Sequence, residues 1–473
     1  MAKTQKYSFN RVETHMINNG HDNYQSIGVL CQKSRRIKNR TNYLIKNEKL
    51  THSQVDKQLK KNEQTLYKKL PAAVSQRCTQ IVGKEWKGFY ESKKAYEKKP
   101  SHFNGKPKPP KYYHHASTIY IPRSSFKVIN NKMFFAKELN LLPMKVMHSK
   151  SQNFNHSAES AIIKEVRFVP LGRSYKFEII YDTSKTKHYI KQHTLLDKNR
   201  CIAIDIGLNN LAAIISNEPS VAPVLISGKP LKSINALYNK QVANLKTKRK
   251  SDSKQKYKSR KNHVLSKSRK RYNQINDYLH KASRFIVNHC LKNDIGTIII
   301  GKNKEWKQES NMGKRNNQNF VSIPHYTFIN KIRYKAQEYG INVIEREESY
   351  TSKASSIDLD PLPVYGDKKE KITFSGRRIK RGLYKSKSGF LLNSDINGAL
   401  NIGRKELGDD FVSRYLSDRG CVNQPILKTM VNVNFPKVFG IKRIPLRSQN
   451  VLKDIELNSV IKTEANSKQQ FVA

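Results

Sequence analysis

The chain has 473 residues and carries 90 Lys and Arg against 37 Asp and Glu, a formal net charge of +53 at pH 7. That length allows about three domains. The charge favours a polyanionic partner such as nucleic acid, whose phosphates release counterions when they are neutralised. No apolar run reaches the ~20 residues that span a bilayer, and the first residues lack the apolar core of a signal peptide, so we expect a soluble intracellular protein without a membrane partner.

The cysteines lie far apart along the chain, at Cys31, Cys78, Cys201, Cys290 and Cys421. No Cys-x-x-Cys pair, the signature of many zinc sites, is present. We therefore predict reduced thiols that pack in the interior.

Residues 24–100 have a helical pattern. Pro71 marks the start of one helix, and apolar residues then recur at helical spacing as far as Trp86 and Phe89. Both aromatic side chains are expected in a core. The basic opposite face of the helix is either solvated or a track for nucleic acid.

The flanking segments predict strands and a linker. Residues 1–22 are polar with a possible strand at Tyr7–Phe9, and the prolines of residues 101–117 indicate an extended connection. Short alternating segments follow, typical of a small barrel or sandwich. They cover residues 118–122, 125–129, 132–136, 161–169 and 174–182.

Residues 201–214, CIAIDIGLNNLAAI, predict a buried strand interrupted by one acid, Asp205. With a period of two, the three isoleucines point to one face, and Asp205 shares the other with Ala203 and Gly207. These small neighbours leave room for a metal or a ligand backbone. The alternative is a carboxylate that ends the strand by capping a turn.

Residues 231–293 are rich in Lys, Arg, Asn and Gln and predict two long helices joined near 251–258. The charge is densest at Arg269, Lys270 and Arg271. These residues either bind nucleic acid or belong to a solvated helical hairpin.

A βαβ unit is expected next. Thr297–Gly301 is a short apolar strand, residues 325–339 predict a helix that ends at Gly340, and Ile341–Glu348 is a second strand. The two strands should be parallel, with their carboxyl ends on one side. Residues 349–392 then form an insertion rich in Ser, Gly and Lys.

Acids occur where these apolar elements end or begin. Asp205 lies on the first strand, Glu347 and Glu348 close the last one, and Asp395 starts a final helix. Ligands collect outside the carboxyl ends of parallel strands, and clustered carboxylates suit Mg²⁺ or Mn²⁺. Two such ions ~4 Å apart would serve a phosphodiester displacement. For Asp395 alone, the alternative is an acid favoured by the helix dipole.

Four segments in this order, IAIDIGLNNLAAI, IGTIIIGKN, EESYTSKAS and NSDINGALNI, resemble the RuvC motifs of the TnpB family of transposon-encoded RNA-guided nucleases and the related compact type V CRISPR effectors. WKGFYESKKAYEKKP and GKPKPPKYY resemble the family's junction between recognition helices and β-barrel. The resemblance covers roughly residues 70–405.

The resemblance implies an α/β multi-domain protein, with an RNase H-like (RuvC) nuclease domain and a wedge-type β-barrel interrupted by a helical recognition domain. The implied layout is barrel 1–22, recognition helices 23–110, barrel 111–199, RuvC 200–349 with a basic hairpin 231–293, a nucleic-acid-binding insertion 350–392, the last RuvC motif 393–410, and a tail 411–473 that is partly disordered near 455–473.

The partners implied are a guide RNA and double-stranded target DNA, in a prokaryotic cytoplasm and at the nucleoid. The expected reaction is cleavage of DNA paired to the guide, next to a short motif. Two alternatives stay open: a nuclease-dead RNA-guided DNA binder and a DNA strand-transfer transposase.

The chain departs from the family at Gly301, where the resemblance implies a glutamate at the end of the fourth RuvC strand. Glu347 and Glu348 end the neighbouring strand, and their opposite parity lets only one of them face Asp205. We favour Glu348 over Glu347, with Glu305 as a further candidate. Asp205, Glu348 and Asp395 are thus the expected catalytic residues and ligands of two Mg²⁺ ions.

A second departure is the zinc ribbon. The family has two Cys-x-x-Cys pairs where residues 350–392 contain no cysteine, so no zinc is expected. The insertion is expected to hold its shape through Tyr365, Phe374 and Leu383, with turns at Gly376 and Gly382.

The insertion also carries a basic run. Its residues either grip the target strand or form a solvated turn. They are Arg377, Arg378, Lys380 and Arg381.

Overall fold

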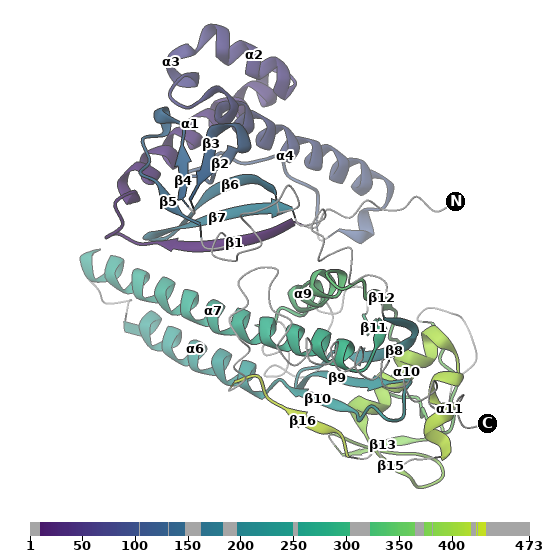
Figure 1. Ribbon diagram of the computed structural model, residues 1–473. Coiled ribbons are helices and arrows are strands. Elements are labelled where there is room, and N and C mark those ends of the chain that lie inside the picture. Colours follow the sequence, from purple (N-terminus) through teal and green to yellow (C-terminus); the bar gives the residue numbers. More distant parts are fainter. Residues whose placement is uncertain are drawn as a thin grey trace, which may run out of the picture. The chain divides into compact units, whose positions relative to one another are not determined.

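The computed structural model in Figure 1 describes residues 10–146 apart from 104 and 131, 162–182, 196–248, 254–302, 322–364, 373–417 apart from 381, 422 and 424–431. These residues divide into two compact units, which fall within Met1–Lys187 and His188–Pro436. Both are mixed α and β. None of the helices in the described ranges combines the length and the apolar character that a bilayer span requires.

The first unit begins its helical part where the sequence predicts it. The helices are α1 (Tyr24–Glu48), α2 (His52–Asn62), α3 (Gln64–Tyr67) and α4 (Ala72–Lys98), followed by the short η1 (Pro100–His102). Pro71 is the residue just before α4. Trp86 is buried and its Nε1 donates to Asn42 Oδ1 at 2.8 Å, while half-buried Phe89 packs against the same core. The core role predicted for both aromatics is confirmed.

The strands of the first unit form two antiparallel sheets. One has the order β1-β7-β6-β2 and the other β3-β4-β5. All five alternating segments are strands, within a residue or two of the predicted bounds. The predicted strand at Tyr7–Phe9 lies outside the described residues, but β1 follows directly and pairs with β7. The bounds are β1 (Asn10–Ile17), β2 (Ile119–Pro122), η2 (Arg123–Ser125), β3 (Phe126–Ile129), β4 (Lys132–Phe135), η3 (Lys137–Leu139), β5 (Met144–Lys145), β6 (Ile162–Leu171) and β7 (Ser174–Asp182).

A six-stranded sheet in the order β12-β11-β8-β9-β10-β16 organises the second unit. β8, β11 and β12 are parallel to one another, as the predicted βαβ unit requires. β9 is antiparallel to both of its neighbours. The bounds are β8 (Asp197–Asp205), β9 (Asn210–Ser216), β10 (Val224–Ser227), β11 (Ile295–Gly301), β12 (Asn342–Arg346) and β16 (Ile426–Lys428).

Helices cover both faces of this sheet. On one face lie α6 (Lys229–Lys248), α7 (Lys254–Lys292) and α9 (His325–Gln337), and on the other lie α10 (Ser394–Leu407) and α11 (Asp410–Ser417). α6 and α7 run side by side, as the predicted hairpin requires (Figure 1). α9 is followed by Gly340 in the left-handed conformation, with φ +68°. The isoleucines of β8 pack toward α7 and α9, and Ala203 packs toward α10. The two faces predicted around Asp205 are confirmed.

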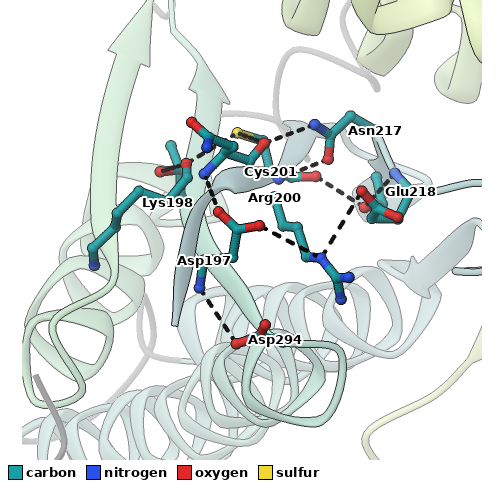
Figure 2. A network of polar contacts seen from close by, with 10 residues as sticks. Asp197, Lys198, Arg200, Cys201, Asn217, Glu218 and Asp294 are labelled. Carbon is teal, nitrogen blue, oxygen red and sulfur yellow. Dashed lines mark hydrogen bonds and ion pairs between the residues drawn. The ribbon is translucent and has the colours of Figure 1, made fainter. Parts of the chain in front are cut away.

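The start of β8 is fixed by a polar network that Figure 2 shows. Asn217 Oδ1 accepts a hydrogen bond from the Cys201 amide at 2.8 Å, and Asn217 Nδ2 donates to the Asn199 carbonyl at 2.8 Å. Asp294 Oδ1 accepts from the Asp197 amide at 3.3 Å. These contacts join β8 to the end of β9 and to the turn before β11, and so set the register that decides where Asp205 emerges.

Four of the cysteines confirm the prediction of packed, reduced thiols. Cys31, Cys78, Cys201 and Cys290 are buried and free, and Cys421 lies outside the described residues.

The insertion folds around residues other than those expected. It contains the antiparallel sheet β13 (Arg377–Lys380), β14 (Leu383–Lys385) and β15 (Leu391–Asn393). Its large buried side chain is Tyr384, whose hydroxyl donates to the Lys353 carbonyl at 2.8 Å. Leu383 and Phe374 are only half-buried, and Tyr365 lies outside the described residues. Adjacent residues of a strand point to opposite faces of the sheet, so Leu383 and Tyr384 cannot both point into the core of the insertion.

Of the two glycines expected as turn points, only Gly382 has the backbone conformation of a left-handed turn. Gly382 has φ +83°, as a turn requires. Gly376 instead makes space for a ring, because a Cβ there would lie 2.6 Å from Tyr384 Cε1. Its role is close packing rather than a left-handed turn.

Asp358 ties three parts of the insertion together. Its Oδ2 accepts from Ser355 Oγ at 2.6 Å, from the Lys387 amide at 2.7 Å and from Ser375 Oγ at 3.2 Å. Burial acts to raise the pKa of Asp358, but the hydrogen bonds outweigh it and lower the pKa. One carboxylate thus cross-links segments that lie far apart in the sequence.

The segment after α10 is more regular than its sequence suggests. It was expected to be a tail from residue 411, yet it supplies α11 and the edge strand β16, which pairs in parallel with β10. A strand of three residues is too short to show a recognisable alternation of apolar and polar residues in the sequence. Residues 455–473 lie outside the described part of the chain.

We predict that Asp358→Ala destabilises the insertion by roughly 1–2 kcal/mol, because three donors lose a charged acceptor. Hydrogen exchange at the Lys387 amide should accelerate about tenfold. Asp277→Ala, which removes an exposed carboxylate paired with Lys281 on α7, is the control and should leave that amide unchanged. Unaltered exchange in Asp358→Ala would show that packing alone holds the insertion.

Candidate active site at the carboxyl edge of the sheet

Asp205 is the last residue of β8, on the face covered by α10. A Cβ built on Gly398 of α10 would lie 2.7 Å from Asp205 Oδ2. With any other residue at 398, the Asp205 carboxylate or the helix would have to shift. The acid is in contact with α10 rather than free at a turn.

Glu348 lies two residues beyond the end of β12. A Cβ on Gly301, the last residue of β11, would lie 2.5 Å from Glu348 Oε2 and would also meet the Ile402 side chain. The Glu348 carboxylate thus occupies the space above the end of β11. This is the space into which a side chain at position 301 would project.

Glu347 turns away from Asp205. Its Oε2 accepts from Lys405 Nζ at 2.7 Å, and its Oε1 accepts from the Ser349 amide at 2.7 Å. The two adjacent glutamates therefore have different environments, as the opposite-parity prediction requires. Glu305 lies outside the described residues.

Asp395 is the second residue of α10. Asn393 caps this helix, with Oδ1 accepting from the Asp395 amide at 3.0 Å and from the Ile396 amide at 3.3 Å. Asn210, the first residue of β9, donates from Nδ2 to Asp395 Oδ2 at 2.7 Å. The side chain of Asp395 is thus held toward the end of the sheet.

Burial and negative neighbours raise the pKa of two of these carboxylates, Asp205 and Glu348. Burial, and then the charge of Asp395, raise the pKa of Asp205, against which Arg378 acts. Burial, and then the charges of Asp205 and Glu347, raise the pKa of Glu348, against which Lys405 acts. Such repulsion is relieved by protons or by a bound cation.

The donor set fits a hard divalent cation, since carboxylate oxygens are the ligands that Mg²⁺ and Mn²⁺ prefer. Among the described residues, no three His, Cys, Asp or Glu side chains are arranged to hold one ion together. The electrostatic contacts instead link two pairs, Asp205 with Asp395 and Asp205 with Glu348.

A pocket of about 670 Å³ opens beside Asp395. Its lining includes Asn210, Lys229 and Arg378. Cationic side chains therefore stand next to the acids, in a space wide enough for part of a polyanion.

Two asparagines of α10 were missed by the sequence analysis. Asn401 Nδ2 donates to the carbonyls of Thr351 (2.9 Å) and Ala354 (2.8 Å). Asn397 also donates to the Ala354 carbonyl at 2.8 Å, and its Oδ1 accepts from the Ser356 amide at 3.0 Å. Both are fully buried. Their four-residue spacing within the otherwise apolar run Ile396–Gly403 is the signal that could have revealed them.

The predicted nucleic-acid-binding residues differ in exposure. Arg377, Arg378 and Lys380 are exposed on β13, as Lys270 is on α7. Arg271 uses Nε and Nη2 within the protein, binding Asn235 Oδ1 at 2.6 Å and the Ser322 carbonyl at 3.0 Å. Arg269 is half-buried, and Arg381 lies outside the described residues.

In the absence of divalent metal, Glu347 and Glu348 should contribute to the stability of the fold with opposite dependence on pH. The raised pKa of Glu348 gives stability that is full below the ordinary carboxyl value near 4 and is lost as the pH rises through the raised value. Glu348→Gln should therefore match the wild type at about pH 4 and exceed its Tm by roughly 2–4 °C at pH 8. Melting curves in EDTA measure this difference.

Glu347→Gln is the matched control. Burial acts to raise the pKa of Glu347, but the bonds from Lys405 and Ser349 outweigh it and lower the pKa. Its stabilisation is present above the ordinary carboxyl value and is lost as the pH falls through the lowered one. Glu347→Gln should therefore lower the Tm at pH 8, and a shift of the same sign in both variants would contradict the geometry.

Comparisons with known proteins identify relatives of two segments. Residues 181–307 match the family described as "Probable transposase" (OrfB_IS605), and residues 325–402 match "Cas12f1-like, TNB domain". The CRISPR-associated endodeoxyribonuclease Cas12f1 of Sulfoacidibacillus thermotolerans is 27% identical over 243 residues, 48% of this chain and 52% of that protein. The TnpB-like protein ORF457 of Acidianus two-tailed virus is 26% identical over 240 residues, 47% of each.

The chain thus spans about half the length of the curated relatives that it matches. A solved structure, titled as the Cas12f1-sgRNA-target DNA complex, aligns with 81% of this chain and 83% of that one, at 16% identity and a TM-score of 0.48. The matches in sequence confirm that the chain is related to the TnpB family and to the compact type V CRISPR effectors.

Proposed function

We propose that the protein is an RNA-guided DNA endonuclease that binds a noncoding guide RNA and cleaves complementary double-stranded DNA next to a short motif. The observation that carries this proposal is the geometry at one edge of the sheet: Asp205 lies against Gly398 of α10, the helix that begins with Ser394 and Asp395. The Glu348 carboxylate lies against Gly301, which follows the Ile300 that pairs with Ile204 of β8. The name of the Cas12f1 relative, an endodeoxyribonuclease, supports the same reaction class.

The sheet of the second unit supports an RNase H-like (RuvC) assignment. A central strand, β8, is followed by β9, which is antiparallel to it, and by β10, which is antiparallel to β9. On the other side of β8 lie β11 and β12, both parallel to it. In the first unit, α1 to α4 fall between β1 and β2 of one sheet. This order supports a wedge-type β-barrel interrupted by a helical recognition domain.

Two Mg²⁺ ions, or Mn²⁺, are the proposed cofactors. The charge of Asp395 acts on Asp205, and the charge of Asp205 acts on Glu348. Two ions that share Asp205 would each need only one further carboxylate, which agrees with the two pairs rather than with one preformed triad. Bound there, magnesium would activate a water for in-line attack on the phosphodiester and stabilise the leaving oxygen.

The protein's own residues prepare this edge for a nucleic acid. Asn210 orients Asp395 through its hydrogen bond to Oδ2. Arg378 and Lys229 line the adjacent pocket and can hold phosphates of the target strand. Over the whole chain, the net charge of +53 suits a large polyanionic partner, which a guide RNA provides.

Asp205→Ala should retain guide-RNA binding and abolish DNA cleavage, because both carboxylate pairs lose their shared member. The test is a cleavage assay with reconstituted RNA and Mg²⁺, alongside a filter-binding assay for the RNA. Cleavage at the wild-type rate in Asp205→Ala would exclude the assignment. Products joined to transposon ends without a guide would instead identify a strand-transfer transposase.

Glu348→Ala and Glu347→Ala, compared in the same assay, identify the glutamate. We expect Glu348→Ala to lose cleavage by at least ~10²-fold and Glu347→Ala to lose less. Full activity in both variants would return Glu305 to consideration. A wild-type protein that binds guide and target without cutting would be the nuclease-dead binder.

A further inference from the structure

The position of Glu348 raises a structural question. An acid at the end of β11 would be fixed by hydrogen bonds to strands on both sides, because β11 lies between β12 and β8. Glu348 instead follows the outermost described strand on that side, two residues beyond its last paired residue, Arg346. Something other than the sheet must hold its carboxylate above Gly301.

The neighbouring residue supplies the first anchor. Lys405 Nζ binds Glu347 Oε2 at 2.7 Å and the Pro363 carbonyl at 3.3 Å. The Lys405 side chain is 7% exposed, so the ion pair is shielded from solvent on the side of the lysine. Glu347 also bonds back to the Ser349 amide, on the other side of Glu348. The backbone on both sides of Glu348 is thereby connected to Lys405.

The second anchor lies three residues further on. Asn401 lies one helical turn before Lys405 on α10. Its Nδ2 donates hydrogen bonds to the carbonyls of Thr351 and Ala354, in the loop that follows Glu348. α10 therefore holds the chain before and after Glu348. The same helix carries Asp395 at its first turn and meets Asp205 at Gly398.

We propose that Lys405 and Glu347 are positioning residues, and that their ion pair, here named the Lys405–Glu347 clasp, holds Glu348 toward Asp205 for metal binding. This inference rests on the proposed function. Neither residue touches the reacting atoms. Through the clasp, the glutamate is set by α10, the element that also carries Asp395.

A purely electrostatic role for Lys405 predicts the opposite outcome. Its positive charge lies near Glu348 and opposes a bound cation, so removing that charge should tighten metal binding if position did not change. If the clasp positions Glu348, removing Lys405 should weaken metal binding despite the more favourable charge. The sign of the change separates the two roles.

Lys405→Met removes the charge and keeps the length of the side chain. We expect Mn²⁺ binding to the protein–guide complex, measured by titration calorimetry, to weaken about 10-fold, and cleavage at saturating metal to slow by about 10- to 100-fold. Guide-RNA affinity should not change. Unchanged or tighter Mn²⁺ binding together with wild-type cleavage would overturn the proposal.

A charge exchange tests the pair itself. Lys405→Glu alone places two acids against each other and should have the lowest affinity for Mn²⁺ of these variants. The double variant Glu347→Lys with Lys405→Glu restores an ion pair and should recover most of that affinity. The exchange of Arg167 and Glu178, a 2.6 Å pair between β6 and β7, is the control and should alter stability without altering metal affinity. A folded double variant without recovery would show that the pair is not the cause.

The design separates this proposal from the proposed function. If the wild type binds Mn²⁺ but never cleaves, the endonuclease assignment fails, and weaker Mn²⁺ binding in Lys405→Met still supports the clasp. If Glu348→Gln leaves Mn²⁺ binding intact, Glu348 is not a ligand and the clasp fails with it, while cleavage lost in Asp205→Ala would still support the nuclease.

Discussion

The close approach of α10 to the end of β8 determines the geometry of the candidate active site. Gly398 allows the helix to pass against Asp205 Oδ2. Three further groups then follow from the course of this one helix: Asp395 at its start, the asparagines that hold the loop after Glu348, and Lys405 near its end. A side chain at position 398 would meet the Asp205 carboxylate and change its place relative to these groups.

Much of the second unit was predictable because its signals are local. Alternation along residues 201–206 gave the face of Asp205, and strand–helix–strand spacing gave the parallel pair β11 and β12. The parity of adjacent residues predicted that only one of Glu347 and Glu348 would face Asp205, and the two side chains do have different environments. Parity alone does not say which of the two it is.

The parts that were not predicted depend on contacts between distant residues. β16 is three residues long and exists through its pairing with β10, about 200 residues away. Tyr384, rather than Leu383, is buried in the insertion, and its hydroxyl binds the Lys353 carbonyl, 31 residues earlier in the chain. Asn397 and Asn401 bond to backbone carbonyls 43–50 residues earlier in the chain. A single sequence carries no pairing information at such separations.

Gly301 has a consequence for how such a site can change through evolution. A Cβ at this position would lie 2.5 Å from Glu348 Oε2, so on this backbone a glutamate at 301 and the present position of Glu348 exclude each other. A glutamate introduced at position 301 would therefore require Glu348 to take another position, so that changes at 301 and 348 are coupled in any rearrangement of this site.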